Sequence, residues 1–256
     1  MSPWNPEAYL KYKDERTQPS YDLVARIDLH APGEMVDIGC GPGNSTQVLC
    51  ERWPAAHRLG VDSSPDMIAR ARQTYPLAAW QVADAATWEP EHTFDLVFSN
   101  ATLQWIPAHT ALFPRLFGWV KPQGALAVQV PANDDSPLHL AVQAVAQRAE
   151  WQAFTEGCHA LFTYHPPSFY YDLLAPLSAR LVLWQTTYYH VLPNHQGLID
   201  WYASTGLRPY LERLPGETER QAFQAQILEI CRERYPLQQD QRVLFPFRRL
   251  FFVAYK

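Results

Sequence analysis

Long apolar runs are missing from this chain of 256 residues: none approaches the roughly 18 consecutive apolar residues of a membrane-spanning helix. The opening residues also lack the basic and apolar regions of a signal peptide, so we expect a cytoplasmic protein. Apolar residues nevertheless make up 47% of the chain and aromatic residues 13%, which suffices for a substantial core and argues against disorder.

Cysteine is scarce, and basic residues are outnumbered by acidic ones. The four cysteines, Cys40, Cys50, Cys158 and Cys231, form no CxxC pair, which disfavours a disulfide framework and a zinc site. Lys and Arg number 21 against 26 Asp and Glu, and the resulting net charge of −5 argues against a nucleic acid as the main partner. A small anion stays compatible with this charge. The oligomeric state is open, with a monomer expected.

A glycine-rich turn after an apolar strand is the most informative feature that is present. Residues 35–43 read MVDIGCGPG, so glycines stand at positions 39, 41 and 43. Glycine has no Cβ and therefore lets backbone come close to a ligand. Nineteen residues after Gly43, Asp62 ends a second apolar run, where a carboxylate can accept hydrogen bonds from both ribose hydroxyls of a nucleoside. The two features together predict a site for a nucleoside-containing cofactor.

Strands and helices alternate from residue 34 onward. We predict strands at 34–38, 57–61, 79–83, 94–99 and 125–130, with helices from residue 44, after Ser64 and over 110–120. Ser64 is suited to cap its helix, because Pro65 follows at the first helical position, where its missing N–H costs nothing. This order is typical of an α/β protein with a Rossmann-like, doubly wound sheet that binds ligands at the carboxyl ends of its strands.

The final third departs from this alternation. Residues 180–192 and 250–255 are rich in aromatic and β-branched residues and are predicted as strands six and seven. About fifty-five residues of helical character lie between them, too many for an ordinary connection, so we predict a helical insertion or lid at 193–246. Within a single domain of 1–256, residues 1–33 would then form an N-terminal helical cap and 34–131 the cofactor-binding half.

The spacing of the glycines distinguishes between two nucleoside cofactors. A dinucleotide fingerprint needs its third glycine three residues after the second, where this chain has Asn44. Asp37 also lies two residues before the first glycine and would repel a pyrophosphate. S-adenosylmethionine carries a cationic sulfonium and an ammonium group, both compatible with a carboxylate. We therefore favour S-adenosylmethionine over a nicotinamide dinucleotide.

This stretch resembles the first motif, DxGxGxG, of the class I S-adenosylmethionine-dependent methyltransferases. In that family Asp62 corresponds to the ribose-binding acid, Asp84 to the acid near the adenine amino group, and residues 99–105 to the segment beside the methionine part and the substrate. The late strands are similar to the family's antiparallel sixth and seventh strands. The resemblance implies cofactor contacts from Tyr9, Asp37, Gly39, Cys40, Gly41, Asn44, Asp62, Ser63, Met67, Asp84, Ala85, Asn100, Ala101 and Trp105.

Stretches outside the cofactor half resemble the trans-aconitate 2-methyltransferase family, namely 186–190 (TTYYH) and 199–209 (IDWYASTGLRP). Members of that family form a monomethyl ester on one carboxylate of a small tricarboxylic acid, so the resemblance implies a carboxyl O-methyltransferase with trans-aconitate as substrate. Residues 134–168 match least clearly, and their role stays open. Two alternatives also stay open: methylation of another small molecule, and a non-catalytic homologue that only binds the cofactor.

A polycarboxylate substrate needs cationic and polar partners. A guanidinium pairs with a carboxylate through two hydrogen bonds, which makes Arg208 the preferred clamp. Arg248 and Arg249 point to opposite sides of a strand, so we expect at most one of them at the site. Weaker partners are expected around the reacting carboxylate, from the set His190, Tyr188, Tyr189, Gln104 and Trp105. No metal ion is expected, and no catalytic base is needed, because a carboxylic acid is already ionised at pH 7.

Overall fold

The computed structural model describes residues 13–256, so Tyr9 and the first part of the predicted cap lie outside the described residues. The described chain forms two compact units. The first, here called the sheet unit, comprises residues 13–131, Thr163–Thr186 and Leu250–Lys256. The second, the helical unit, comprises Ala132–Phe162 and Thr187–Arg249. The functional division into cap, cofactor half and lid stays a prediction.

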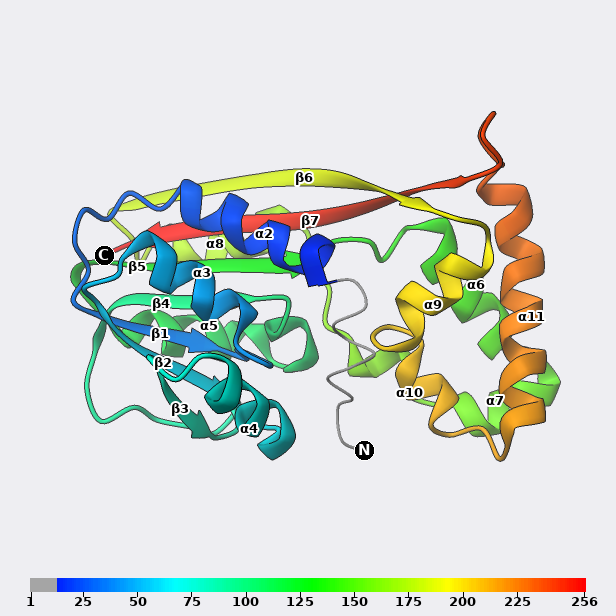
Figure 1. Cartoon of the computed structure of the whole chain (residues 1–256), viewed down its shortest axis with the longest axis horizontal. Helices are drawn as coiled ribbons and strands as arrows, with labels where there is room; N and C mark the ends of the chain where they lie inside the picture. Colours follow the sequence, from blue (N-terminus) through cyan, green and yellow to red (C-terminus); the bar gives the residue numbers. More distant parts are fainter. Residues whose placement is uncertain (1–12) are drawn as a thin grey trace. The chain divides into compact units, whose positions relative to one another are not determined.

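Seven strands form one sheet in the order β3-β2-β1-β4-β5-β7-β6 (Figure 1). The strands are β1 (Glu34–Ile38), β2 (His57–Asp62), β3 (Ala79–Val82), β4 (Phe94–Asn100), β5 (Val120–Pro131), β6 (Arg180–Leu192) and β7 (Val243–Tyr255). The pairs of β1 with β2 and β4, β2 with β3 and β4 with β5 are parallel. The end of β7 meets the beginning of β5, where Gln123 N–H donates to Lys256 O, so β7 is antiparallel. The predicted Rossmann-like sheet with antiparallel last strands is confirmed.

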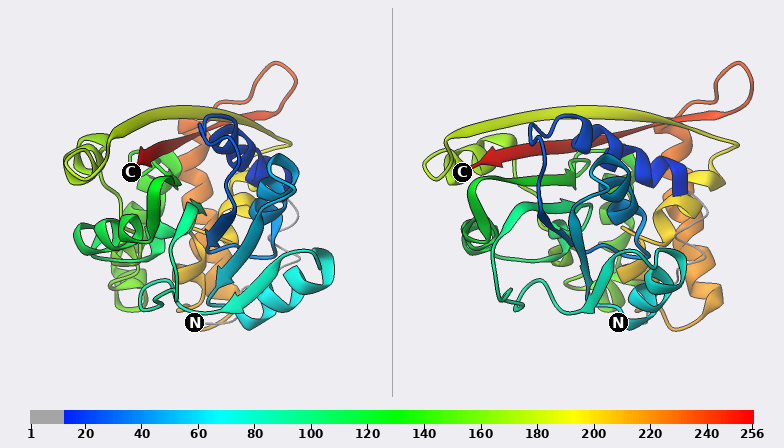
Figure 2. Two further views of the ribbon diagram at one scale, coloured as in Figure 1. Left: turned by 90° about the vertical axis from the view of Figure 1, so that its left-hand side faces the viewer. Right: turned by 60° about the vertical axis from the view of Figure 1, so that its left-hand side comes forward.

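Helices cover both faces of the sheet unit, as the pattern of alternating strands and helices predicts (Figure 2). α2 (Lys13–Ala25), α3 (Asn44–Arg52) and α4 (Pro65–Thr74) lie on one face, and α5 (His109–Gly118) and α8 (Pro167–Leu174) on the other. The central strands are apolar and buried, because both faces are covered. Ser64 caps α4 as predicted, its hydroxyl accepting a hydrogen bond from Met67 N–H at 3.3 Å.

The helical unit contains the part of the chain that the sequence explained least. Its helices are α6 (Pro137–Ala146), α7 (Ala149–Thr155), η2 (His159–Leu161), α9 (Gln196–Ala203), α10 (Arg208–Leu211) and α11 (Glu217–Arg234). The last three occupy the predicted insertion. β7 begins at Val243, however, so residues 243–246 belong to a strand, earlier than the predicted start at 250. Val243, Phe245 and Phe247 are buried at every second position, and Pro246 between them obscured this period in the sequence.

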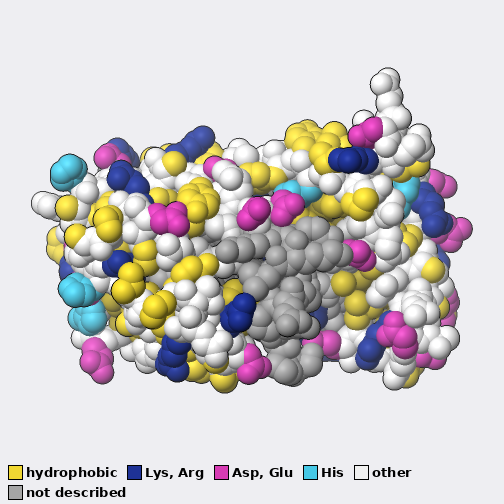
Figure 3. Space-filling view, viewed as in Figure 1, with side chains coloured by type: hydrophobic (Ala, Val, Ile, Leu, Met, Phe, Trp, Pro, Cys, Tyr) yellow, Lys and Arg dark blue, Asp and Glu magenta, His cyan; other side chains and the backbone are white. Residues whose placement is uncertain are grey.

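The surface of the described residues carries mixed charge. On the face drawn in Figure 3, acidic and basic side chains are interspersed instead of forming a field of one sign. That pattern agrees with the net charge of −5 and gives no support to a polyanionic partner. Within residues 13–256, no helix has the length and apolar character needed to cross a membrane.

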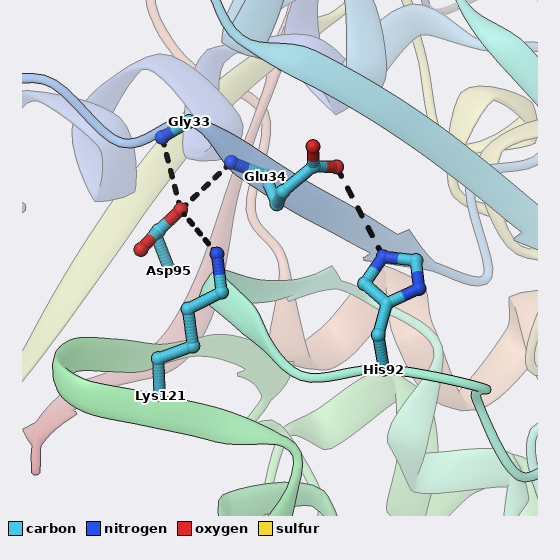
Figure 4. Close-up of polar contacts among 5 residues, drawn as sticks. All are labelled: Gly33, Glu34, His92, Asp95 and Lys121. Atoms are coloured by element: carbon cyan, nitrogen blue, oxygen red, sulfur yellow. Dashed lines mark hydrogen bonds and ion pairs between the residues drawn. The ribbon is translucent and has the colours of Figure 1, made fainter.

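Asp95 connects the amino-terminal ends of the parallel strands β1, β4 and β5 (Figure 4). Its Oδ2 accepts hydrogen bonds from Gly33 N–H (2.9 Å), Glu34 N–H (2.8 Å) and Lys121 Nζ (3.0 Å). Burial alone would raise the pKa of Asp95, but the donors at Glu34, Lys121 and Gly33 outweigh it and hold the pKa below its ordinary value. β1, β4 and β5 thus start in a fixed register, which sets where their carboxyl ends lie.

Candidate functional site

The three glycines after β1 all have left-handed backbone, but for different reasons. Their φ angles are 71°, 54° and 94° at Gly39, Gly41 and Gly43. A Cβ at Gly39 would lie 2.1 Å from the side chain of Thr102, and one at Gly43 would lie 2.7 Å from the ring of Tyr75. A Cβ at Gly41 would meet no atom of the described residues within 4 Å. The outer glycines are therefore required by packing, whereas the middle one leaves open space beside bare backbone.

Asp62, at the end of β2, joins the glycine turn to the start of α4. Its Oδ2 accepts a hydrogen bond from Gly41 N–H and its Oδ1 one from Ser64 N–H, both at 2.9 Å. Burial raises the pKa of Asp62, and the donors at Ser64 and Gly41 act in the opposite direction. Each carboxylate oxygen has a second lone pair, so Asp62 can also accept the two hydroxyls of a ribose.

Asp37, near the end of β1, is buried and holds the first turn of α3. Its Oδ2 accepts hydrogen bonds from the hydroxyls of Ser45 and Thr46, both at 2.6 Å. Burial raises the pKa of Asp37 to about 6, although both hydroxyls lower it. No described residue donates to its Oδ1, which is also buried. Asp37 therefore anchors the helix with one oxygen and presents a buried acceptor with the other.

We expect Asp37→Asn to stabilise the protein without its cofactor at pH 8. The pKa of Asp37 is raised on folding, so the ionised carboxylate lowers the free energy of unfolding at high pH. This loss of stability disappears as the pH falls through about 6 towards the unfolded value of 3.8, because the folded protein then holds the carboxyl in its neutral form. A shift of this size corresponds to a cost of up to about 3 kcal/mol. Asparagine does not titrate, and its oxygen can still accept from Ser45 and Thr46.

Urea denaturation of both proteins between pH 8 and pH 4 measures this effect. The advantage of Asp37→Asn should shrink steadily as the pH is lowered, because the wild-type carboxyl then becomes neutral as well. A difference between the two proteins that does not change with pH would contradict a raised pKa at this position. If Asp37 contacts the cofactor as the sequence predicts, S-adenosylhomocysteine should bind the variant less tightly.

The end of β4 continues into a short helix that carries two of the predicted residues. Ala101 has left-handed backbone with a φ of 55°, and η1 (Leu103–Trp105) follows. Gln104 Nε2 donates to Ala101 O at 2.7 Å, which fixes the orientation of its amide. Its Oε1 and the Oδ1 of Asn100 are buried, and neither accepts a hydrogen bond within the described part of the chain. Trp105, the next residue in the sequence, is half-buried.

Other predicted cofactor residues have roles in packing or turns. Cys40 is buried against Ile68, Ala71 and Trp80, so only its backbone is placed to face a ligand. Asn44 Oδ1 accepts a hydrogen bond from the Tyr75 hydroxyl at 3.3 Å. The remaining residues, which surround the ends of β2 and β3, are the buried Met67 and Ala85 and the exposed Ser63 and Asp84. Asp84 Oδ1 accepts from Ala86 N–H at 2.8 Å, so this carboxylate shapes the turn after β3.

The unmatched buried atoms indicate which kind of ligand fits. Asp37 Oδ1, Asn100 Oδ1 and Gln104 Oε1 are all acceptors, and their residues lie at or shortly after the carboxyl ends of the neighbouring strands β1 and β4. Acceptors of this kind suit a ligand with N–H donors, such as the ammonium group of an amino acid, and not a pyrophosphate. Among residues 13–256, no group of three His, Cys, Asp or Glu side chains could hold a metal ion.

Most of the predicted substrate residues lie in the helical unit, and three of them come together there. Tyr188 and His190 lie on the same side of β6, with their rings stacked at 6.5 Å. The Arg249 guanidinium lies 5.9 Å from the Tyr188 ring and 4.7 Å from that of Phe247, and it is buried. Tyr189 points to the other side of the strand and is 61% exposed. Among the predicted substrate residues, Tyr188, His190 and Arg249 are therefore better placed than Tyr189 to contact one ligand together.

The two other arginines are engaged by carboxylates. Arg208 Nε donates to Glu212 Oε1 at 2.7 Å within α10 and the residue after it. Arg248 Nε donates to Ala132 O at 2.7 Å, and its Nη2 donates to Asp135 Oδ1 at 2.5 Å. Arg248 and Arg249, which are adjacent in β7, thus have different environments, as the alternation of side chains along a strand predicts. Arg248 is the one that holds the chain at Ala132 and Asp135. Glu212 thus accepts from the Nε–H of Arg208, which is one of the N–H donors of its guanidinium.

Several residues that shape the site were not identified from the sequence. Ser45 and Thr46 hold Asp37, and Thr102 fills the space at Gly39 and donates to its carbonyl oxygen at 3.0 Å. Hydroxyl residues in the first turn of a helix that follows a glycine motif are a signal that could have identified the first two. Thr102 lies 63 positions from Gly39, and no local pattern marks it.

Two solved structures show the same fold. The crystal structure of the YcgJ protein from Bacillus subtilis has a TM-score of 0.59 at 13% identity, and the match covers 93% of this chain and 98% of that one. A Haemonchus contortus phosphoethanolamine N-methyltransferase 2, in complex with S-adenosyl-L-methionine, has a TM-score of 0.59 at 15% identity, with 96% and 56% covered. At these identities the likeness concerns the fold alone.

Sequence comparisons go further than the fold. Residues 35–124 match the family described as Methyltransferase domain. The chain is 45% identical to proteins named trans-aconitate 2-methyltransferase from Escherichia coli O157:H7 and from Shigella flexneri, over 99% of its own length and 98% of theirs. Because this identity extends over both units, the chain belongs to the trans-aconitate 2-methyltransferase family.

Proposed function

We propose that this protein transfers the methyl group of S-adenosylmethionine to one carboxylate of trans-aconitate, giving the monomethyl ester and S-adenosylhomocysteine. The observation that carries the proposal is the 45% identity over 99% of the chain to relatives of that name. An identity confined to the cofactor half would support a methyltransferase of unspecified substrate. Here the match includes the helical unit, which holds Tyr188, His190, Arg208 and Arg249.

The sheet unit supplies residues that fit the cofactor. Asp62 would hold the ribose hydroxyls, the backbone at Gly41 would lie against the ligand, and Asp37 Oδ1 would accept from its ammonium group. When bound, S-adenosylmethionine supplies a methyl group made electrophilic by its sulfonium. Calorimetry with S-adenosylhomocysteine and with NADH tests this assignment, and binding of NADH alone would overturn it.

The chain needs to orient the substrate more than to activate it. A carboxylic acid with an ordinary pKa near 4 is an anion at pH 7, so no side chain has to remove a proton before it attacks. Enclosing the carboxylate strips it of hydration and thereby makes it more reactive. A strong arginine pair on the reacting carboxylate would withdraw electron density from it. We therefore assign Arg208 and Arg249 to the spectator carboxylates. The weaker partners Tyr188, His190, Gln104 and Trp105 remain the candidates for the reacting one.

A methyl-transfer assay with labelled cofactor tests the activity directly. Trans-aconitate is compared with cis-aconitate, citrate and isocitrate, each over a range of concentrations. We expect the highest kcat/KM with trans-aconitate. Turnover of only a phenol or an amine would contradict the carboxylate mechanism. Tight cofactor binding with no turnover of any acid would instead favour a non-catalytic homologue.

Arg208→Ala is expected to raise the KM for trans-aconitate at least about tenfold, because a charge-assisted pair contributes roughly 1.5–3 kcal/mol. The Kd for S-adenosylhomocysteine should stay within about twofold, since cofactor contacts are assigned to the sheet unit. Steady-state kinetics and calorimetry measure the two quantities separately.

Glu212→Gln distinguishes a substrate clamp from a structural ion pair. The carboxylate of Glu212 neutralises Arg208 through their 2.7 Å contact. If Arg208 binds the substrate, Glu212→Gln should leave the KM unchanged or lower it, because a competing negative charge is removed. If the pair only supports α10, both variants should raise the KM to the same extent, and the clamp would be wrong.

The proposal also covers where the protein works and with what. The four cysteines are free thiols, which agrees with the reducing environment of the cytoplasm. We propose the small polycarboxylate as its partner, with no role for nucleic acid or a membrane. We further propose that a monomer suffices, which sedimentation at the concentrations of the assay would test.

A further inference from the structure

The segment between β4 and α5 has little internal support. Ala101 has a φ of 55°, which costs a residue with a Cβ about 1 kcal/mol, and η1 spans only three residues. A helix of this length has few hydrogen bonds of its own. η1 nevertheless carries Gln104 and Trp105, both of which are candidates for contact with the reacting carboxylate. The position of η1 must therefore be set by contacts from outside the segment.

His109, the first residue of α5, supplies one such contact. It is 1% exposed, and its Nε2 lies 2.9 Å from the carbonyl oxygen of Leu103 in η1. A carbonyl oxygen can only accept, so Nε2 carries a proton, and because burial lowers the pKa of His109 we take the ring as neutral. Nδ1 is then an acceptor, and it lies 2.9 Å from the hydroxyl of Tyr170, which donates to it. Burial lowers the pKa of His109, which keeps this tautomer neutral.

Tyr170, in α8, is itself held on both sides. It is 1% exposed and stacks on Phe252 of β7 with ring centroids 4.9 Å apart. Phe113 packs against its edge at 5.1 Å. A second connection comes from the same part of the chain, where Thr163 N–H donates to Gln104 O at 2.8 Å. Residues 163–170 thus contact η1 directly and through His109, all within the sheet unit.

We propose that His109 and Tyr170 are positioning residues for methyl transfer, which hold η1 so that Gln104 and Trp105 face the reacting groups. The inference rests on the proposed function. The order of contacts is Phe252, Tyr170, His109, Leu103, and it runs from the last strand of the sheet to the segment after β4. Neither side chain needs to touch the substrate, because both act through the backbone of η1.

Tyr170→Phe tests the proposal, because it removes the hydroxyl and keeps the ring on Phe252. We expect kcat to fall about tenfold, since small displacements of positioned groups reduce rates strongly. The Kd for S-adenosylhomocysteine should stay within about threefold, because Asp62 and the glycine turn are unchanged. His109→Leu should lower kcat further, and His109→Gln should recover part of it, because glutamine can donate to Leu103 O and accept from Tyr170.

Tyr235→Phe is the matched control. Its hydroxyl is likewise buried and accepts a hydrogen bond from Leu138 N–H at 3.1 Å, within the helical unit. Thermal unfolding of both variants corrects for lost stability. The proposal predicts that only Tyr170→Phe lowers kcat, and equal losses of kcat in the two folded variants, or none in either, would overturn it. Absence of turnover by the wild-type protein would instead contradict the proposed function.

Discussion

Asp62→Asn is expected to weaken the binding of S-adenosylhomocysteine at least about 100-fold, which corresponds to about 3 kcal/mol. The two oxygens of Asp62 accept separate backbone donors, Gly41 N–H and Ser64 N–H. Asparagine has one acceptor and one donor group, so its NH₂ must face one of these N–H groups. A buried donor left without an acceptor costs roughly 1–3 kcal/mol, and the turn would open to relieve it. The proposed contact of Asp62 with the ribose would be lost in the same step.

Asp66→Asn provides the control for the loss of one negative charge. Asp66 lies in the first turn of α4, four positions away, and is exposed. Its substitution removes a favourable interaction with the helix dipole of only about 0.3–1 kcal/mol and touches no part of the glycine turn. Calorimetry should therefore show nearly wild-type affinity for Asp66→Asn. Equal affinity of Asp62→Asn and the wild type would mean that the ligand does not use the end of β2.

The features that the sequence predicted well depend on neighbours along the chain. The strand of 34–38 and the Ser64 cap were found because their causes, an apolar run and a Ser-Pro pair, lie within a few residues. β6 was likewise predicted with its observed bounds, Arg180–Leu192, because its side chains favour strands throughout. The ends of parallel strands share one edge of a sheet, so the meeting of Asp62 with the glycine turn also followed from topology.

The features that the sequence did not predict depend on contacts between distant residues. Asp37 was predicted to contact the cofactor, but that one of its oxygens also accepts hydrogen bonds from Ser45 and Thr46 was not predicted. The contact between Gly39 and Thr102 spans 63 positions. The pairing of Arg208 with Glu212 has the i, i+4 spacing of a helix, so here a local signal was present and was missed.

Gly39→Ala and Gly41→Ala should separate folding from cofactor binding, although the two glycines are only two positions apart. At Gly39 a methyl group would lie 2.1 Å from the side chain of Thr102, and moving that side chain would break its hydrogen bond to the carbonyl oxygen of Gly39. This clash adds to the cost of left-handed backbone, so we expect a loss of about 3 kcal/mol or more in the free energy of unfolding. Urea denaturation without cofactor measures it.

At Gly41 only the cost of the left-handed backbone applies, about 1 kcal/mol, because a Cβ there meets no atom of residues 13–256 within 4 Å. The methyl group would, however, fill the space in which a ligand approaches the backbone. We therefore expect Gly41→Ala to fold nearly as well as the wild type and to bind S-adenosylhomocysteine between about tenfold and 100-fold less tightly. Gly39→Ala combined with Thr102→Gly should recover the part of the stability that the clash removed, while the backbone strain persists. If Gly41→Ala bound the cofactor like the wild type, the open space beside Gly41 would not be where the ligand lies, and the site would have to be placed elsewhere along the edge of the sheet.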